Sequence, residues 1–290
     1  MHLKARAKIN WTLDITGQRA DGYHLMDMLM QPVSLSDDVF VHPAQTITLT
    51  TGGEPLLPAD EHHLAMRAAK ALQAHAGCPH GAAIHVEKHI PVGAGMGGGS
   101  ADAAAVLIGL NHLWGLGLSG EALEAIGLTL GADVPFCIRG GLTRTTGIGE
   151  CMQALPCART YPFVVVQPCE GLSTREIFTA WHAQPDADKP DNASAALALA
   201  QGNAAALSAS MGNVMQPISV RRRPGIDEAL HALTAQGAFA AQMTGSGSAV
   251  FGAFADEASA DAAFAAISAR WERTFRCETT MESVVLVDED

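Results

Sequence analysis

Five glycines lie within seven residues in the segment Pro91–Ala101, which reads PVGAGMGGGSA. Glycine lets a backbone approach a ligand closely and adopt positive φ angles. An alternating segment typical of a strand, Ala83–Ile90, precedes the glycines, and an apolar helical pattern, Ala101–Trp114, follows them. A loop between a strand and a helix start can bind phosphate through unpaired N–H groups and the positive end of the helix dipole. The segment therefore predicts a phosphate-binding loop.

Three common classes of nucleotide-binding protein do not fit this loop. A Walker A motif ends in Gly-Lys-Ser/Thr, whereas Gly99 is followed by Ser-Ala. A G-x-G-x-x-G pattern begins at Gly93, but a Rossmann domain needs an acidic residue at a strand end about 20 residues later. That stretch, Leu116–Glu124, has loop and helix character instead. The V-A-I-K, H-R-D and D-F-G motifs of protein kinases are absent.

Two polar residues follow the glycines at positions suited to a helix start. We expect Ser100 to be the N-cap, because its hydroxyl can accept a hydrogen bond from a backbone N–H group of the first turn. Asp102 is then expected in the first turn, where the helix dipole favours negative charge. These two residues define the predicted beginning of the helix.

One aspartate stands in a second segment that contains glycine and proline, Gly131–Pro135. Pro135 should keep Val134 out of the helical conformation, which places Asp133 on a loop after a helix. A carboxylate held there could accept the proton of a hydroxyl group during phosphoryl transfer. The alternative is an aspartate that only forms a turn.

The first strand is predicted at Ala7–Ile15, where large apolar residues alternate with others. Lys8 and Asn10 have the same side-chain parity, so both could face one site. The opposite face would carry four large apolar side chains: Ile9, Trp11, Leu13 and Ile15. Taken alone, a lysine at this position would ordinarily lie on a solvent-exposed face.

Composition limits the possible functions of the chain. It has 290 residues and a net charge of −12, which argues against binding to nucleic acid. No apolar run approaches the ~18 residues of a membrane span, and we expect an untargeted, soluble, cytoplasmic protein with no membrane partner. The six cysteines form no C-x-x-C pair and predict free thiols. Three arginines at 221–223 are expected to be a solvated helix end.

The glycine-rich segment resembles the ATP loop of the GHMP kinases, a family named after galacto-, homoserine, mevalonate and phosphomevalonate kinases. These enzymes lack a Walker A motif. Further segments resemble, in order, the members that phosphorylate the 2-hydroxyl of a cytidyl-diphosphate sugar alcohol in the non-mevalonate isoprenoid pathway. These segments are Ala7–Asn10, Gly17–His24, Gly131–Pro135, Gly171–Phe178 and Met243–Phe251.

The resemblance implies an α+β fold with two domains, mixed or antiparallel sheets and helices, and an active site in the cleft between the domains. Residues 1–153 would form the N-terminal ATP-binding domain and residues 154–290 the C-terminal domain. The expected cofactors are ATP and Mg²⁺, because phosphoryl transfer from ATP uses the metal. The sequence does not indicate the metal ligands. We expect a monomer or a weak homodimer.

The resemblance also implies roles for individual residues. Asp133 would be the general base, and Lys8 would stabilise charge on the transferring group or the incipient alkoxide. Asn10 would contact the substrate, Tyr23 and His24 would recognise cytosine, and Phe178 is a candidate second aromatic face. The second glycine-rich segment, Met243–Phe251, would shape the site. The expected ATP-binding residues are Pro91, Val92, Gly93, Ala94, Gly95, Met96, Gly97, Gly98, Gly99, Ser100 and Ala101.

Three alternatives remain open. One is another GHMP kinase, of the homoserine or mevalonate type, although the Tyr23-His24 pair argues against it. Another is a GHMP-fold protein that binds a ligand without catalysis, although Lys8 and Asp133 are both present. The third is an NAD-dependent oxidoreductase. The chain also departs from the family pattern near the adenine, because it has Glu61-His62-His63-Leu64 where relatives often have an Asn-Leu pair.

Overall fold

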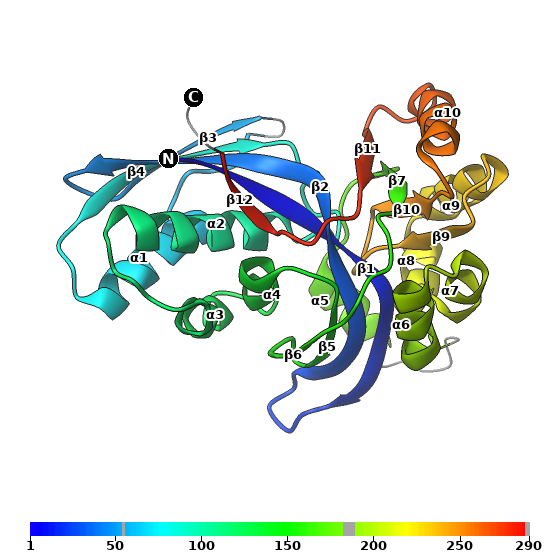
Figure 1. The fold of residues 1–290 in the computed structure, drawn as a ribbon, viewed down its shortest axis with the longest axis horizontal. Coiled ribbons are helices and arrows are strands. Elements are labelled where there is room, and N and C mark those ends of the chain that lie inside the picture. The colour runs from blue at the N-terminus through cyan, green and yellow to red at the C-terminus, as the bar shows by residue number, and fades with distance from the viewer. Residues whose placement is uncertain (54–55, 182–188, 288–290) are drawn as a thin grey trace.

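The computed structural model describes residues 1–53, 56–181 and 189–287. A long antiparallel hairpin of β1 (His2–Gln18) and β2 (His24–Ala44) runs through the molecule (Figure 1). It is the centre of an eight-stranded sheet. The other strands are β3 (Thr48–Gly53), β4 (Gly81–Lys88), β5 (Thr143–Gly147), β6 (Cys151–Ala154), β8 (Gly212–Asn213) and β12 (Val284–Val287). The order along the sheet is β12-β1-β2-β4-β3. In addition, β5 pairs with β2, β6 pairs with β5, and β8 pairs with β1.

A second sheet of four antiparallel strands lies in the other half of the molecule (Figure 1). Its strands are β7 (Pro162–Val166), β9 (Ala240–Met243), β10 (Val250–Ala253) and β11 (Thr274–Glu278). Their order is β11-β7-β10-β9. The large sheet also contains two parallel pairs, β1 with β8 and β3 with β4, so the mixed and antiparallel sheets agree with the prediction.

The helices divide between the two halves (Figure 1). The first four are α1 (Leu64–Ala76), α2 (Gly98–Leu113), α3 (Gly120–Leu128) and α4 (Val134–Arg139), which pack on one another and, through α2, on the large sheet. The later ones are α5 (Thr174–Trp181), α6 (Asn192–Gln201), α7 (Ala204–Ser210), α8 (Gln216–Arg222), α9 (Gly225–Ala235) and α10 (Glu257–Ser268). In the described part of the chain, no helix is both long and apolar enough to cross a membrane. The arginines at 221–223 are exposed at the end of α8, as predicted, and all six cysteines are free thiols.

The first strand does not keep one apolar face, and this part of the prediction is wrong. The pairing of β1 with β2 shifts register between Asn10 and Thr12. A bulge of this kind changes the face on which the following residues lie. Ile9 and Trp11 therefore pack in one core, whereas residues 13 and 15 pack in the other. Both faces of the strand are buried at this point.

Trp11 joins the long hairpin to the second sheet. Its ring is fully buried and makes edge-on contacts with Tyr161, Phe163 and Phe251, at centroid distances of 5.3, 5.1 and 5.9 Å. Its indole Nε1–H donates to Gln31 Oε1 at 2.8 Å. In addition, β12 from the end of the chain pairs with β1. The division of the chain at residues 153 and 154 stays a prediction.

The structure corrects two predictions, the N-cap at Ser100 and the non-helical conformation of Val134. The helix after the glycines begins at Gly98, and its N-cap is Gly97 with a φ of 72°, not Ser100. Glycine can take this left-handed conformation without steric cost, so the helix starts earlier than its side chains suggest. Asp102 is consequently the fifth residue of α2 and is buried. Val134 opens α4, because a proline is tolerated in the first turn of a helix.

We predict that Trp11→Ala lowers the free energy of unfolding by about 3–5 kcal/mol, because a large buried ring leaves a cavity and Gln31 loses its donor. Urea denaturation of the purified protein measures this change. Leu197→Ala is the control: Leu197 is 57% exposed on α6, and its truncation should change the unfolding free energy by less than about 0.5 kcal/mol. Similar losses of unfolding free energy in the two variants would contradict the role of Trp11 in joining the hairpin to the second sheet.

Candidate active site

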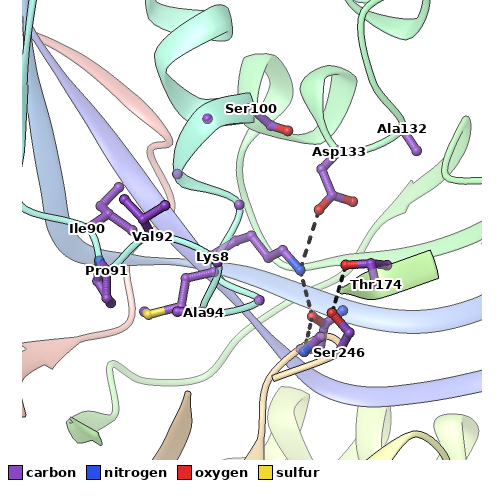
Figure 2. A pocket seen from close by; sticks show the side chains of 18 of the residues that line it. Lys8, Ile90, Pro91, Val92, Ala94, Ser100, Ala132, Asp133, Thr174 and Ser246 are labelled. Atoms are coloured by element: carbon purple, nitrogen blue, oxygen red, sulfur yellow. Dashed lines mark hydrogen bonds and ion pairs between the residues drawn. The ribbon is translucent and has the colours of Figure 1, made fainter. Parts of the chain in front are cut away.

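A cavity of about 580 Å³ is lined by residues from both halves of the chain. The glycine loop, defined here as Pro91–Ala101, lines it with ten of its residues, 91 to 100, whereas Ala101 is buried in α2. Lys8 and Asn10 of β1 and Asp133 also line the cavity. Figure 2 shows the Lys8 side chain extending from the strand toward Asp133. The structure thus brings these predicted residues to one place.

The pair of Lys8 and Asp133 is the central charged contact of the cavity. Lys8 Nζ lies 3.5 Å from Asp133 Oδ2. The lysine side chain is only 6% exposed, whereas the aspartate side chain is 34% exposed and accessible from the cavity. Asp133 is the residue before α4, and the backbone N–H of Cys137 donates to its carbonyl oxygen at 3.1 Å. The backbone of Asp133 is therefore held in place, and its carboxylate is open to a ligand.

Asn10 is fixed between the lysine and the second glycine loop, Met243–Phe251. Its Oδ1 accepts from Lys8 Nζ at 2.7 Å and from the Gly245 backbone N–H at 3.1 Å. Its own backbone N–H donates to Thr244 Oγ1 at 3.1 Å. These contacts orient the amide, leave Nδ2 near Met28 Sδ at 3.4 Å, and set the direction of the lysine side chain.

The glycine loop presents backbone N–H groups at the start of α2. Gly97 caps this helix without a side chain, and the helical hydrogen bond nearest its start runs from the Ala101 N–H to the Gly97 carbonyl at 2.9 Å. The N–H groups of the first turn therefore have no carbonyl acceptor within the helix and can bind an anion. Gly93, Gly95 and Gly97 all have positive φ, between 68° and 78°. This conformation is one that glycine adopts readily.

A buried charge cluster beneath the glycine loop was missed by the sequence reasoning. Lys88, the last residue of β4, donates to Asp102 Oδ2 at 2.6 Å and also to Asp37 Oδ2. We call Lys88, Asp37 and Asp102 the ionic triad. Burial raises the pKa of Asp102 to about 8, although the Lys88 ammonium opposes this rise. The sequence contained one signal for this cluster. Asp102 stands among alanines at 101 and 103–105, where a solvent-exposed aspartate is not expected.

The three predicted aromatic residues differ in their relation to the cavity. Phe178 of α5 lines the cavity and stacks on His24, with ring centroids 4.3 Å apart and an interplanar angle of 24°. Nearby, Thr174 and Ser246 share a hydrogen bond of 2.9 Å between their hydroxyls, as Figure 2 shows. Tyr23 is 61% exposed at the turn of the hairpin and is not among the cavity residues. The structure stacks His24 on Phe178, but of the three predicted aromatic residues only Phe178 lines the cavity, and His24 and Tyr23 do not.

His63 lines the cavity at the start of α1, where the sequence departs from the family pattern. Its Nδ1 accepts a hydrogen bond from the Ala65 N–H at 3.2 Å, so the imidazole is the N-cap of this helix. Burial lowers the pKa of His63 below its usual value, and the nearby Lys88 ammonium lowers it further. The ring is therefore neutral near pH 7 and carries its hydrogen on Nε2.

The donor set of the cavity fits a magnesium ion that arrives with a nucleotide. Mg²⁺ usually keeps several waters and binds through few carboxylates together with phosphate oxygens. Of the two carboxyl groups that line the cavity, Asp102 is buried against Lys88, and Asp133 is the accessible one. No cluster of three or more His, Cys, Asp or Glu suited to a metal occurs in the described residues. Asp133 could hold the hydration shell of such an ion.

Comparison with known proteins gives the class. Residues 63–141 match the GHMP kinases N-terminal domain, and residues 195–273 match the GHMP kinases C-terminal domain. A crystal structure of homoserine kinase from Cytophaga hutchinsonii is 18% identical and superposes with a TM-score of 0.77 over 99% of this chain and 97% of that chain, which is a likeness of fold alone. Together with the glycine loop and the cavity, these matches define an ATP-dependent small-molecule kinase of the GHMP class, with the predicted α+β fold.

Two further relatives narrow the assignment. The 4-diphosphocytidyl-2-C-methyl-D-erythritol kinase of Pelotomaculum thermopropionicum is 42% identical over 273 residues, 93% of each chain. A crystal structure of 4-(cytidine 5′-diphospho)-2C-methyl-D-erythritol kinase is 33% identical, with a TM-score of 0.83 over 96% of this chain and 99% of that chain. The chain belongs to the 4-diphosphocytidyl-2-C-methyl-D-erythritol kinase family, which confirms the resemblance seen in the sequence.

We predict that Gly95→Ala abolishes measurable ATP binding or lowers it at least about tenfold. A Cβ at this position would lie 2.3 Å from the Thr244 carbonyl oxygen, so the loop would have to move. Gly115→Ala is the matched control, because Gly115 has a similar φ of 64° with no atom within 4 Å of the added Cβ. In Gly115→Ala the free energy of unfolding should fall by only about 1 kcal/mol, because alanine is strained at this positive φ. Isothermal titration with ATP and thermal unfolding measure both effects, and equal binding by the two variants would contradict this account.

Proposed function

We propose that this protein transfers the γ-phosphoryl group of ATP to the 2-hydroxyl of 4-diphosphocytidyl-2-C-methyl-D-erythritol. The observation that carries the proposal is the Lys8–Asp133 pair, 3.5 Å apart in the same cavity as the start of α2. A general base and a fixed cation beside a phosphate-binding helix start are the parts that phosphoryl transfer to an alcohol requires. The names of the full-length relatives support this choice of alcohol.

The cavity residues suggest how the transfer proceeds. The γ-phosphate would lie on the N–H groups at the start of α2, with residues 91–101 following the rest of the triphosphate. Asp133 would accept the proton of the attacking hydroxyl while the new O–P bond forms and the bond to the ADP oxygen breaks. Lys8 would stabilise the charge that develops on the transferring group. A bound Mg²⁺ would neutralise phosphate charge.

The ring of Phe178 suits the cytidyl part of the substrate. It lines the cavity with His24 stacked on it, and stacking of a base on such a face contributes about 1–3 kcal/mol. Tyr23, on the same hairpin turn, would contact the base only from outside the cavity. Asn10, with its amide oriented by Lys8 and Gly245, would face the sugar alcohol. A monomer or weak homodimer remains our prediction for the assembly.

A coupled ADP-release assay tests the substrate. We expect turnover with 4-diphosphocytidyl-2-C-methyl-D-erythritol and ATP, and none above background with homoserine or mevalonate. Turnover with either of these alcohols but not with the cytidyl substrate would assign the protein to another branch of the GHMP kinases. No turnover with any of the three, together with measurable ATP binding, would favour a protein that binds ligands without catalysis.

We predict that Asp133→Asn folds normally and lowers kcat by about 10²- to 10⁴-fold, the range expected for loss of a general base. The amide keeps the size of the side chain but accepts no proton, so the KM for ATP should change by only a few-fold. Steady-state kinetics and a thermal unfolding curve measure both. Asp261→Asn on α10 is the control and should retain wild-type kinetics, because Asp261 is exposed and does not line the cavity. Wild-type kcat in Asp133→Asn would remove Asp133 from the mechanism.

A further inference from the structure

The ionic triad joins the two ends of the glycine loop. Asp37 of β2 accepts hydrogen bonds from the backbone N–H groups of His89 and Ile90, at 2.6 and 2.8 Å, just before the loop begins. Asp102 lies on α2 just after the loop ends. The ammonium of Lys88 binds both carboxyl groups. A single lysine therefore ties the start of the loop to its end.

The triad also supports the floor of the loop directly. Gly98, the first residue of α2, packs on Lys88 and Ile90: an added Cβ would lie 3.4 Å from Lys88 Nζ and 3.0 Å from Ile90 Cγ2. The N–H groups that would receive phosphate start at this residue. A change in the position or charge of Lys88 therefore affects the phosphate-binding start of α2.

The charges of the triad do not balance if both carboxyl groups are ionised. The Lys88, Asp37 and Asp102 side chains are each 0–3% exposed, and one ammonium faces two carboxyl groups. An uncompensated charge in such surroundings is strongly unfavourable. Beneath a site for a polyphosphate, a surplus negative charge would also repel the ligand. One proton on a carboxyl group removes both problems.

The hydrogen bonds indicate which carboxyl group holds the proton. Asp37 accepts from Lys88 and from two backbone N–H groups, so its ionised form is well satisfied. Asp102 accepts from Lys88 through Oδ2 alone. Its Oδ1 is buried and has no hydrogen-bond partner among the described residues. The ionised form is therefore favoured at Asp37 and the neutral form at Asp102.

We propose that Asp102 is a positioning residue that acts in its protonated form, as the neutral member of a triad that holds the glycine loop for ATP. Loss of this proton would leave the triad with a surplus negative charge under the start of α2 and weaken nucleotide binding. The proposal rests on the proposed function only in that the glycine loop holds ATP; it does not depend on which alcohol is phosphorylated.

The surroundings of Asp102 define the pH range of the effect. The titratable groups near it on the packed elements are Lys88 on β4, Asp37 on β2 and Cys137 on α4, with Lys8 on β1 and His63 before α1 close by. Burial raises the pKa of the Cys137 thiol, and the two carboxylates raise that of Lys88 despite its burial, so neither loses its proton near pH 8. The pKa of Asp102, at about 8, therefore sets the transition.

The test is the affinity for Mg·ATP, measured by isothermal titration without an acceptor alcohol between about pH 7 and 9.5. We expect the wild-type Kd to rise about tenfold over this range, as for a single proton whose pKa shifts by a unit or more on binding. Asp102→Asn imitates the protonated carboxyl and should give a Kd that does not change with pH. Protonation of the nucleotide itself affects both proteins equally, so its contribution cancels in the ratio of the wild-type Kd to the Asp102→Asn Kd at each pH.

Two further variants distinguish a positioning role of the protonated Asp102 from a general disruption of the ionic triad. Asp102→Ala leaves Lys88 with one partner and a cavity, and should weaken binding at every pH. Asp37→Asn turns an amide N–H₂ toward Lys88 or toward the backbone donors, and should also weaken binding at every pH, in contrast to Asp102→Asn. Parallel pH profiles for wild type and Asp102→Asn, or a tenfold loss of affinity in Asp102→Asn at pH 7, would overturn the proposal.

Stability gives a readout independent of ATP. The pKa of Asp102 is raised above its unfolded value of 3.8, so the folded protein binds more protons between about pH 4 and 8. The wild type should therefore lose stability relative to Asp102→Asn as the pH rises through this range. Thermal unfolding at pH 6 and 9 measures the difference. A difference in Tm between the two proteins that is the same at both pH values would contradict a protonated Asp102.

Discussion

The phosphate-binding loop depends on direct contact between backbones from the two halves of the chain. A Cβ at Gly95 would lie 2.3 Å from the Thr244 carbonyl oxygen, and a Cβ at Gly171 would lie 2.5 Å from the Gly93 carbonyl oxygen. At such distances only glycine fits. The Ala249 N–H also donates to the Ala94 carbonyl at 3.1 Å. The glycines thus allow both the binding of a ligand and the close contact between the two halves, and residues of the second half support the shape of the loop.

The long first strand brings the catalytic candidates to this contact. Lys8 donates its backbone N–H to the Met96 carbonyl at 2.9 Å, which ties the strand to the glycine loop. On the same stretch, Ile9 and Trp11 point into the core between the sheets. The bulge before Thr12 then turns the following residues toward the other core. One strand can therefore support both cores because its regular alternation is interrupted at the site.

Local patterns were enough to predict the first strand, the strand and helix that flank the glycine loop, and the loop itself, but not features set by contacts distant in sequence. The helix beginning near residue 100 was predicted from its apolar stripe, yet its cap is Gly97, which has a positive φ and lies close to the Lys8 side chain. The pairing of Lys8 with Asp133 came from resemblance, because 124 intervening residues separate them in the chain. The ionic triad draws on residues 37, 88 and 102, and no spacing rule relates a strand, a strand end and a helix in this way.

The charge of the cavity explains why this backbone architecture is needed. Lys8 is paired with Asp133, and Lys88 is neutralised by Asp37 beside the neutral Asp102, in a chain of net charge −12. Long-range attraction therefore contributes little to the binding of a polyanion such as ATP. The positive potential must come from N–H groups at the start of α2, whose effect is local and increases as water is excluded. Such donors act only when their geometry is held, so binding affinity depends on the same backbone contacts and on the same buried triad that fix the shape of the loop.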